Sequence, residues 1–160
     1  MKKNDLAGST IVVDGSNVAQ YGGQKPASFM HIKKMLETLK EDGASKIIII
    51  CDANLRHIID DKDAFNEMLA TNEIIMSPAG IKADKFIIDY ARRNNALIVT
   101  DDKFREYKTD KWVSANIDKI TIGFMFIEDD LILEAVDSHS ISINEKKKEK
   151  KKGWHLFRKN

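Results

Sequence analysis

Residues 11–18 read IVVDGSNV, an apolar run that ends abruptly in a carboxylate, a glycine and two small polar residues. In an open α/β sheet, ligands and metals gather just beyond the carboxyl ends of parallel strands. The stretch therefore predicts a buried strand that delivers Asp14 to a functional site, with Gly15 allowing a sharp turn or a close backbone approach. Asp14 alone is equally well explained as the cap of whatever follows the strand.

The composition is that of a globular protein: 42% of the 160 residues are hydrophobic and 32% are charged. No apolar run approaches the length of a membrane span, and the N-terminus lacks the apolar segment of a signal peptide, so we expect a cytoplasmic protein that does not contact membranes. The lone Cys51 lies in an apolar run, which favours a buried thiol and excludes a cysteine zinc site within this chain.

The charge divides the chain into a domain over residues 1–144 and a basic tail over residues 145–160. The tail holds eight Lys or Arg and two Glu, a net charge of +6, whereas residues 1–144 carry a net charge of −5. Its lysines, among them Lys147 and Lys151, stand beside Trp154, and this combination of cations and an aromatic ring favours contact with RNA. A disordered solubilising tail is the alternative.

Further strands are expected where short apolar runs recur, and helices where apolar residues follow the helical period. Strands alternating with helices predict a three-layer α/β sandwich with a mostly parallel central sheet of about five strands. After the first strand, we expect strands at 46–51, 73–76, 96–100 and 119–127, of which the last lies at a sheet edge. We expect three helices: one that begins after the cap Ser28, one at 61–70 and one at 83–95. Residues 131–136 form a short element whose type the pattern does not decide.

Acids recur at the ends of these strands. Asp14 and Asp52 follow the first and second strands, the Asp101-Asp102 pair follows the strand at 96–100, and Asp84 begins a helix. If the strands before Asp14 and Asp101 are neighbours, these carboxylates converge. Carboxylates crowded in this way repel each other and need a cation, for which oxygen ligands favour Mg²⁺ or Mn²⁺. Such an ion activates water for attack on a phosphodiester.

Each acid also has a simpler explanation. Asp84 is in the first turn of a helix, where the helix dipole stabilises it, and Asp52 is a plausible loop cap. The adjacent acids Asp101 and Asp102 repel each other and are harder to explain without a compensating group.

Four basic residues near these acids, Arg56, Lys82, Lys85 and Arg105, are candidates for guiding a polyanion to the site. Each one taken singly is better explained as a solvated surface charge. No histidine is assigned to catalysis.

With these residues in view, the sequence resembles the NYN domains of the PIN-like nuclease superfamily, most closely the Regnase-like (MCPIP-type) ribonuclease domain. The matching segments are residues 11–19, 52–56, 83–87 and 98–106, within a match that runs from about residue 10 to about residue 127. The resemblance implies a central parallel sheet, a Mg²⁺-dependent endoribonuclease activity and single-stranded or loop RNA as the substrate.

Carried over by position, Asp14, Asp84 and Asp102 resemble the metal-site acids of the family, and Asn17 resembles the polar partner of Asp14. Glu106 resembles a peripheral acid beyond the fourth strand. The family often has two adjacent acids where this chain has Ala83 and Asp84. Asp101 stands where the family commonly has Asn.

The extra carboxylate of Asp101 compensates for the missing acid in this interpretation, so we include Asp101 with the metal ligands and Asn17 with the catalytic residues. Eukaryotic relatives often carry a cysteine-rich zinc finger after this domain, which this chain does not contain, and the basic tail is a candidate for its RNA-holding role.

Other functional classes remain open at this stage. The main alternative is a domain of the same fold that binds RNA as an adaptor and cuts it weakly or not at all. Metal-dependent cutting of RNA distinguishes the nuclease from this adaptor. The adhesion site of von Willebrand type A domains is disfavoured, because it needs a second Ser where this chain has Val18. A phosphotransfer receiver domain is also disfavoured, because its group of acids and its Lys have no strong match in this chain. The sequence leaves both a monomer and a homodimer open.

Deleting residues 145–160 is expected to weaken RNA binding and to flatten its salt dependence, because each lost phosphate contact on a single strand lowers the slope of log K against log salt by about 0.7. Binding of a labelled RNA, measured at low and high salt for both chains, tests this. Unchanged affinity at both salt concentrations would contradict it.

Overall fold

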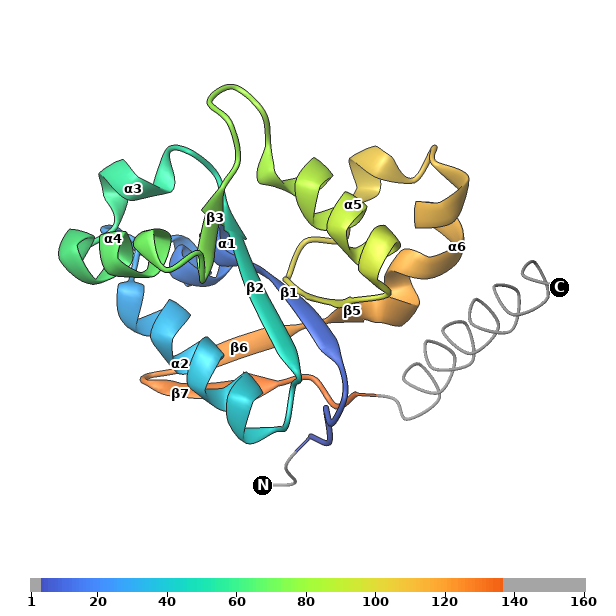
Figure 1. The fold of residues 1–160 in the computed structure, drawn as a ribbon, viewed down its shortest axis with the longest axis horizontal. Helices are drawn as coiled ribbons and strands as arrows, with labels where there is room; N and C mark the ends of the chain where they lie inside the picture. Colours follow the sequence, from blue (N-terminus) through green and yellow to red (C-terminus); the bar gives the residue numbers. More distant parts are fainter. Residues whose placement is uncertain (1–3, 137–160) are drawn as a thin grey trace, which may run out of the picture.

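The computed structural model describes residues 4–136, and a five-stranded parallel sheet lies at its centre (Figure 1). Its strands run in the order β3-β2-β1-β4-β5, and they are β1 (Thr10–Asp14), β2 (Lys46–Cys51), β3 (Ile74–Met76), β4 (Leu97–Val99) and β5 (Thr121–Ile122). Helices cover both faces of this sheet. The predicted fold class, an α/β sandwich with a parallel sheet of about five strands, is therefore confirmed.

The order of the strands reverses at β1. From β1 the chain moves outward to β2 and β3, then crosses back to place β4 against the other side of β1 and β5 beyond it. Right-handed connections consequently put the helices before β2 and β3 on one face of the sheet and those before β4 and β5 on the other. A reversal of this kind opens a crevice at the carboxyl ends of the two strands where it occurs, here β1 and β4.

Both central strands are buried on their two faces. Ile11, Val12 and Val13 of β1 and Ile98 of β4 are fully inaccessible to solvent, as expected for parallel strands covered by helices on each side. Unbroken aliphatic runs of this kind supply most of the apolar surface that folding removes from water. The rigid core therefore ends at the residues that follow these strands.

The three predicted helices begin and end near the expected positions, whereas the helices at 15–19, 55–58 and 111–120 were not predicted. Ser28 caps α2, since its Oγ accepts the backbone N–H of His31. Asp61 and Asp110 cap two further helices in the same manner. The helices are α1 (Gly15–Ala19), α2 (Phe29–Glu41), α3 (Leu55–Ile58), α4 (Lys62–Ala70), α5 (Ala83–Asn94) and α6 (Lys111–Ile120), with short 3₁₀ turns at Tyr21–Gly23 and Arg105–Tyr107.

Gly15 allows the close approach that the sequence suggested. A Cβ at this position would lie 2.7 Å from Cγ2 of Ile49 and even closer to Sγ of Cys51. Cys51 itself is buried, as predicted, and burial raises the pKa of its thiol. The start of α1 thus packs directly on β2.

The predicted edge strand over 119–127 is wrong in extent. Residues 119 and 120 belong to α6, β5 spans two residues, and β6 (Phe124–Ile127) leaves the sheet to pair with β7 (Asp130–Leu133) in an antiparallel hairpin. The hairpin buries Phe124 and Phe126 and exposes Met125 and Ile127. That alternation is typical of a strand with one covered face, whereas a continuous strand of the main sheet would be covered on both.

The basic tail, including Lys147, Lys151 and Trp154, lies outside the described residues, so its predicted contacts with RNA stay predictions. In the described part of the chain, no helix combines the length and the apolar character that crossing a membrane requires.

Candidate active site

Asp14 is held at the end of β1 by hydrogen bonds to both of its carboxylate oxygens. Oδ1 accepts the backbone N–H of Asn17 at 3.2 Å, and Oδ2 accepts the hydroxyl of Thr100 at 3.0 Å. The side chain is 4% exposed. Asp14 therefore caps α1 and stands at the end of β1 next to β4, and its part in a functional site stays a prediction.

Thr100 is a site residue that the sequence reasoning did not identify. Its hydroxyl donates to Asp14 and accepts the backbone N–H of Asp102 at 3.1 Å, so one buried side chain joins the ends of β1 and β4. Asp102 is exposed, and its Oδ1 accepts the N–H of Phe104 at 2.8 Å. In the sequence, the only indication of this role is that Thr100, a hydroxyl residue, stands between an apolar strand and two acids.

Asn17 forms the second link between the two strand ends. Its side-chain Oδ1 accepts the backbone N–H of Asp101 at 2.9 Å, while its own N–H binds Asp14. The carboxylate of Asp101 is exposed and lies 3.4 Å from the N–H of Phe124 in β6. The structure thus brings the backbone of Asp101 to Asn17 and directs its carboxylate toward the hairpin. That Asp101 ligates a metal stays a prediction.

Asp84 reaches the site because Asp52 fixes the start of α5. The N-cap position of α5, Lys82, makes no side-chain capping bond. Instead Oδ1 of Asp52 accepts the N–H of Ala83 at 2.8 Å, and the N–H of Asp52 donates to Oγ of Ser16 at 2.9 Å. Asp52 therefore acts as a cap, but for a helix that begins 31 residues further along the chain.

The four carboxylates Asp14, Asp52, Asp84 and Asp102, hereafter the acid cluster, interact electrostatically. Burial, reinforced by the charges of Asp84 and Asp52, raises the pKa of Asp14 to about 7 despite the hydrogen bonds from Asn17 and Thr100. Burial and the charges of Asp102 and Asp52 raise the pKa of Asp84 to about 6. Burial is the larger cause of both shifts and the neighbouring carboxylates add to it, so Asp14 and Asp84 hold their protons more tightly than free carboxyl groups do.

The donor chemistry of the acid cluster fits a hard divalent cation. Within residues 4–136, none of its members has a Lys, Arg or His partner within ion-pair distance, and no group of three or more His, Cys, Asp or Glu side chains is arranged to hold a metal directly. Mg²⁺ usually keeps several waters and binds proteins through one or two carboxylates together with substrate phosphates. One or two members of the cluster therefore suffice.

The predicted basic residues surround this edge of the sheet. Arg56 lies on α3 after β2, Lys82 and Lys85 lie at the start of α5 after β3, and Arg105 follows β4, all of them exposed. Lys82 pairs with Glu106 at 3.3 Å. Glu106 also raises the pKa of Asp84, less than the other causes do, and its place as a peripheral acid of the site stays a prediction.

A parallel sheet with acids gathered at its reversal point and exposed cations around them defines an α/β domain with an acidic site at the carboxyl edge of the sheet. The chain belongs to the Zc3h12a-like Ribonuclease NYN domain family, whose model matches residues 8–145. The resemblance to NYN domains found in the sequence is thereby confirmed. A search of the curated proteins found no significant match.

Among solved structures, the chain is similar to the nuclear protein-only RNase P 2 of Arabidopsis thaliana. Two structures of that protein match at 18% and 20% identity, with TM-scores of 0.65 and 0.64. The matches cover 81% and 80% of this chain but 30% of the plant protein in each case. At this identity the likeness shows a shared fold.

The raised pKa of Asp14 predicts how pH affects stability without metal. Because the pKa rises from 3.8 to about 7 on folding, the folded state binds the proton more tightly, and its stability falls as the pH rises through this range. The variant Asp14→Asn cannot ionise, so its melting temperature relative to wild type should increase from pH 5 to pH 8 in EDTA. Differential scanning fluorimetry measures this. A difference independent of pH would contradict the assignment.

Proposed function

We propose that this chain is a Mg²⁺- or Mn²⁺-dependent endoribonuclease that hydrolyses phosphodiester bonds in single-stranded or loop RNA. The observation that carries the proposal is the acid cluster, which collects negative charge at the reversal point of the sheet. In the described chain no Lys, Arg or His lies within ion-pair distance of it, and Lys82 acts on Asp84 only from farther away. An RNA phosphate could approach such a cluster only if a cation lay between them. Membership of a ribonuclease domain family supports the same conclusion.

Asp14, Asp84 and Asp102 are the candidate ligands: one or two of them would bind the ion directly, and the others would contact its bound waters. Asp14 is already oriented by Asn17 and Thr100, so little side-chain entropy is lost when it binds. A bound divalent ion supplies a water of lowered pKa and neutralises charge on the phosphate. We retain Asp101 as a further candidate ligand.

The surrounding residues attract and place the substrate. The exposed cations Arg56, Lys82, Lys85 and Arg105 surround the carboxyl edge of the sheet, where they favour a polyanion near the acid cluster. Thr100 and Asn17 keep the ends of β1 and β4 in register, and Asp52 keeps α5 in place. These bonds preorganise the site before RNA arrives.

Cleavage of an end-labelled single-stranded RNA with Mg²⁺ or Mn²⁺, compared with EDTA, tests the proposal. Metal-dependent cutting should fall by about 100-fold or more in Asp14→Asn, the scale expected when a group that places the reacting atoms is lost. The matched control is Asp63→Asn, an exposed acid on α4, which should cut like wild type.

Cutting that persists in EDTA would contradict the metal dependence. Absence of cutting across several RNAs, with binding retained, would instead support the adaptor of the same fold.

A further inference from the structure

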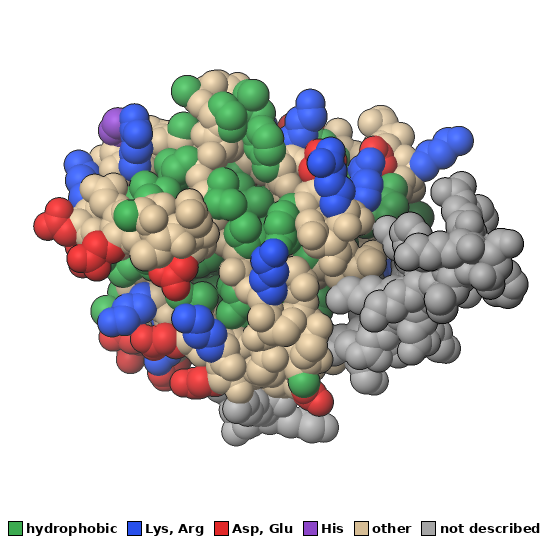
Figure 2. Space-filling view, in the orientation of Figure 1, with side chains coloured by type: hydrophobic (Ala, Val, Ile, Leu, Met, Phe, Trp, Pro, Cys, Tyr) green, Lys and Arg blue, Asp and Glu red, His purple; other side chains and the backbone are tan. Residues whose placement is uncertain are grey.

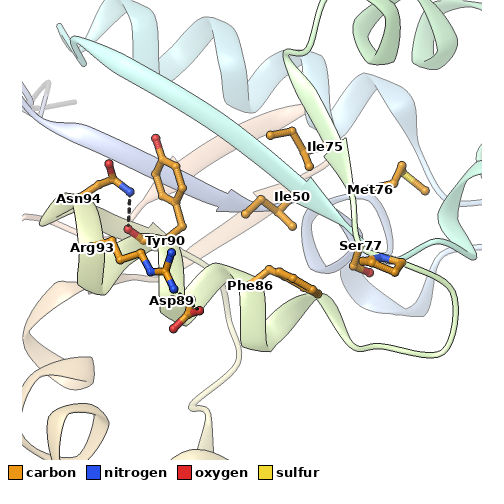
Figure 3. A pocket seen from close by; sticks show the side chains of 10 residues that line it. Ile50, Ile75, Met76, Ser77, Phe86, Asp89, Tyr90, Arg93 and Asn94 are labelled. Carbon is orange, nitrogen blue, oxygen red and sulfur yellow. Dashed lines mark hydrogen bonds and ion pairs between the residues drawn. The ribbon is translucent and has the colours of Figure 1, made fainter.

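A pocket of about 400 Å³ lies between α5 and the β2–β3 edge of the sheet (Figure 3). Ile50, Ile75 and Met76 of the strands lie opposite Phe86 of α5 in this view. Ile75 and Phe86 are 41% and 37% exposed, respectively, so apolar surface remains in contact with water. The volume is within the range of pockets that enclose small organic groups.

The pocket lies beside the acid cluster and on the same face of the sheet. Asp84 and Phe86 are two residues apart on α5 and so point to different sides of that helix. Ile50, which lines the pocket, is the β2 residue paired in register with Asp14 and brings the two sites together. Neighbouring strands are separated by about 4.8 Å, and paired residues point to the same face. A polynucleotide with a phosphate at the acid cluster therefore has its adjacent nucleotides within reach of the pocket.

The lining combines flat apolar surface with polar groups, as a nucleobase does. Asp89 and Asn94 of α5 contribute polar atoms, and the Nδ2 of Asn94 is occupied by the carbonyl of Tyr90 at 2.9 Å. The Tyr90 hydroxyl is buried and has no hydrogen-bond partner among the described residues. Unstacked RNA bases are typically bound by an aromatic ring on one face and by hydrogen bonds at their edges.

The charge around the pocket favours RNA as its occupant. Lys82, Lys85 and Arg93 are exposed on or next to α5. Lys82 pairs with Glu106 at 3.3 Å and Arg93 with Asp89 at 3.6 Å, both in exposed ion pairs that an RNA phosphate can compete with. Figure 2 shows exposed hydrophobic side chains in the middle of this face, with Lys and Arg side chains around them and Asp and Glu side chains mainly on the left of the view. An apolar surface bordered by cations suits a base attached to a phosphate backbone.

We propose that this pocket binds one base of the RNA held at the acid cluster, with Phe86 stacking on the base and Asp89 accepting a hydrogen bond from an exocyclic amino group. The proposal rests on the proposed function for the identity of the ligand. It makes the pocket the part of the site that senses which nucleotide lies next to the cleaved bond.

The test compares binding of two fluorescein-labelled oligonucleotides of equal length, a single-stranded RNA and its abasic counterpart, which keeps the phosphates and lacks the bases. All chains keep the wild-type acid cluster and Mg²⁺ is present, while both strands carry phosphorothioate linkages that resist hydrolysis. A gel confirms that the strands stay intact, so that anisotropy reports binding without cleavage. Phe86→Ala should weaken binding of the RNA about fivefold or more, the scale of losing one stacked base, and leave binding of the abasic strand unchanged.

Two further variants separate stacking from general damage. Phe86→Trp keeps an aromatic face and should retain the preference for bases. Met30→Ala removes another exposed hydrophobic side chain, on α2 and away from the pocket, and should bind both strands like the parent.

Equal loss on both strands in Phe86→Ala, no loss on either, or no binding of RNA by the parent would overturn the proposal. The proposal would also be overturned if the protein were a dimer that Phe86→Ala dissociates while the preference for bases stays unchanged. In that case a second copy of the chain would occupy the pocket. Base-dependent binding that requires Phe86, in a chain that cuts no RNA, would refute the proposed nuclease and leave the base pocket standing.

Discussion

The parallel pairing of β1 with β4 is the constraint on which the site depends. It aligns Val13 with Val99, so that Asp14 and Thr100 leave the sheet side by side. The Thr100 hydroxyl then connects the Asp14 carboxylate to the backbone of Asp102. Without this pairing, the two acids would sit on separate loops, and no electrostatic coupling to Asp84 on α5 would follow.

Holding these carboxylates together opposes folding. Burial and mutual repulsion raise the pKa values of Asp14 and Asp84, which means that their charged forms are destabilised in the folded chain. The fully buried aliphatic residues of β1 and β4 lie directly behind the acids and supply the compensating stability. Perturbed carboxylates on a rigid support are typical of functional sites, where stability is given up for chemistry.

Much of this arrangement could be predicted from the sequence because its signals are local. Apolar runs that end in acids marked β1, β2 and β4, and the helical period marked α5 with Asp84 in its first turn. Parallel strands place their carboxyl ends at one edge, so the convergence of Asp14, Asp84 and Asp102 followed from topology.

The remaining features depend on contacts between distant residues. Asp52 caps a helix 31 residues away, and the role of Thr100 appears only once β4 lies next to β1. Residues 119–127 are apolar in a pattern that fits the end of a helix as well as a strand, and Gly123 separates β5 from β6. The direction of the Asp101 carboxylate depends on that hairpin, which local pattern did not predict.

Direct measurement of Mn²⁺ binding tests the central claim, that the acid cluster holds a divalent ion. Electron paramagnetic resonance reports the loss of the free Mn²⁺ signal as protein is added, without any RNA or cleavage. The account predicts binding by wild type and by Asp63→Asn, and its loss in Asp14→Asn and Asp84→Asn. Equal Mn²⁺ binding by all four proteins would contradict it.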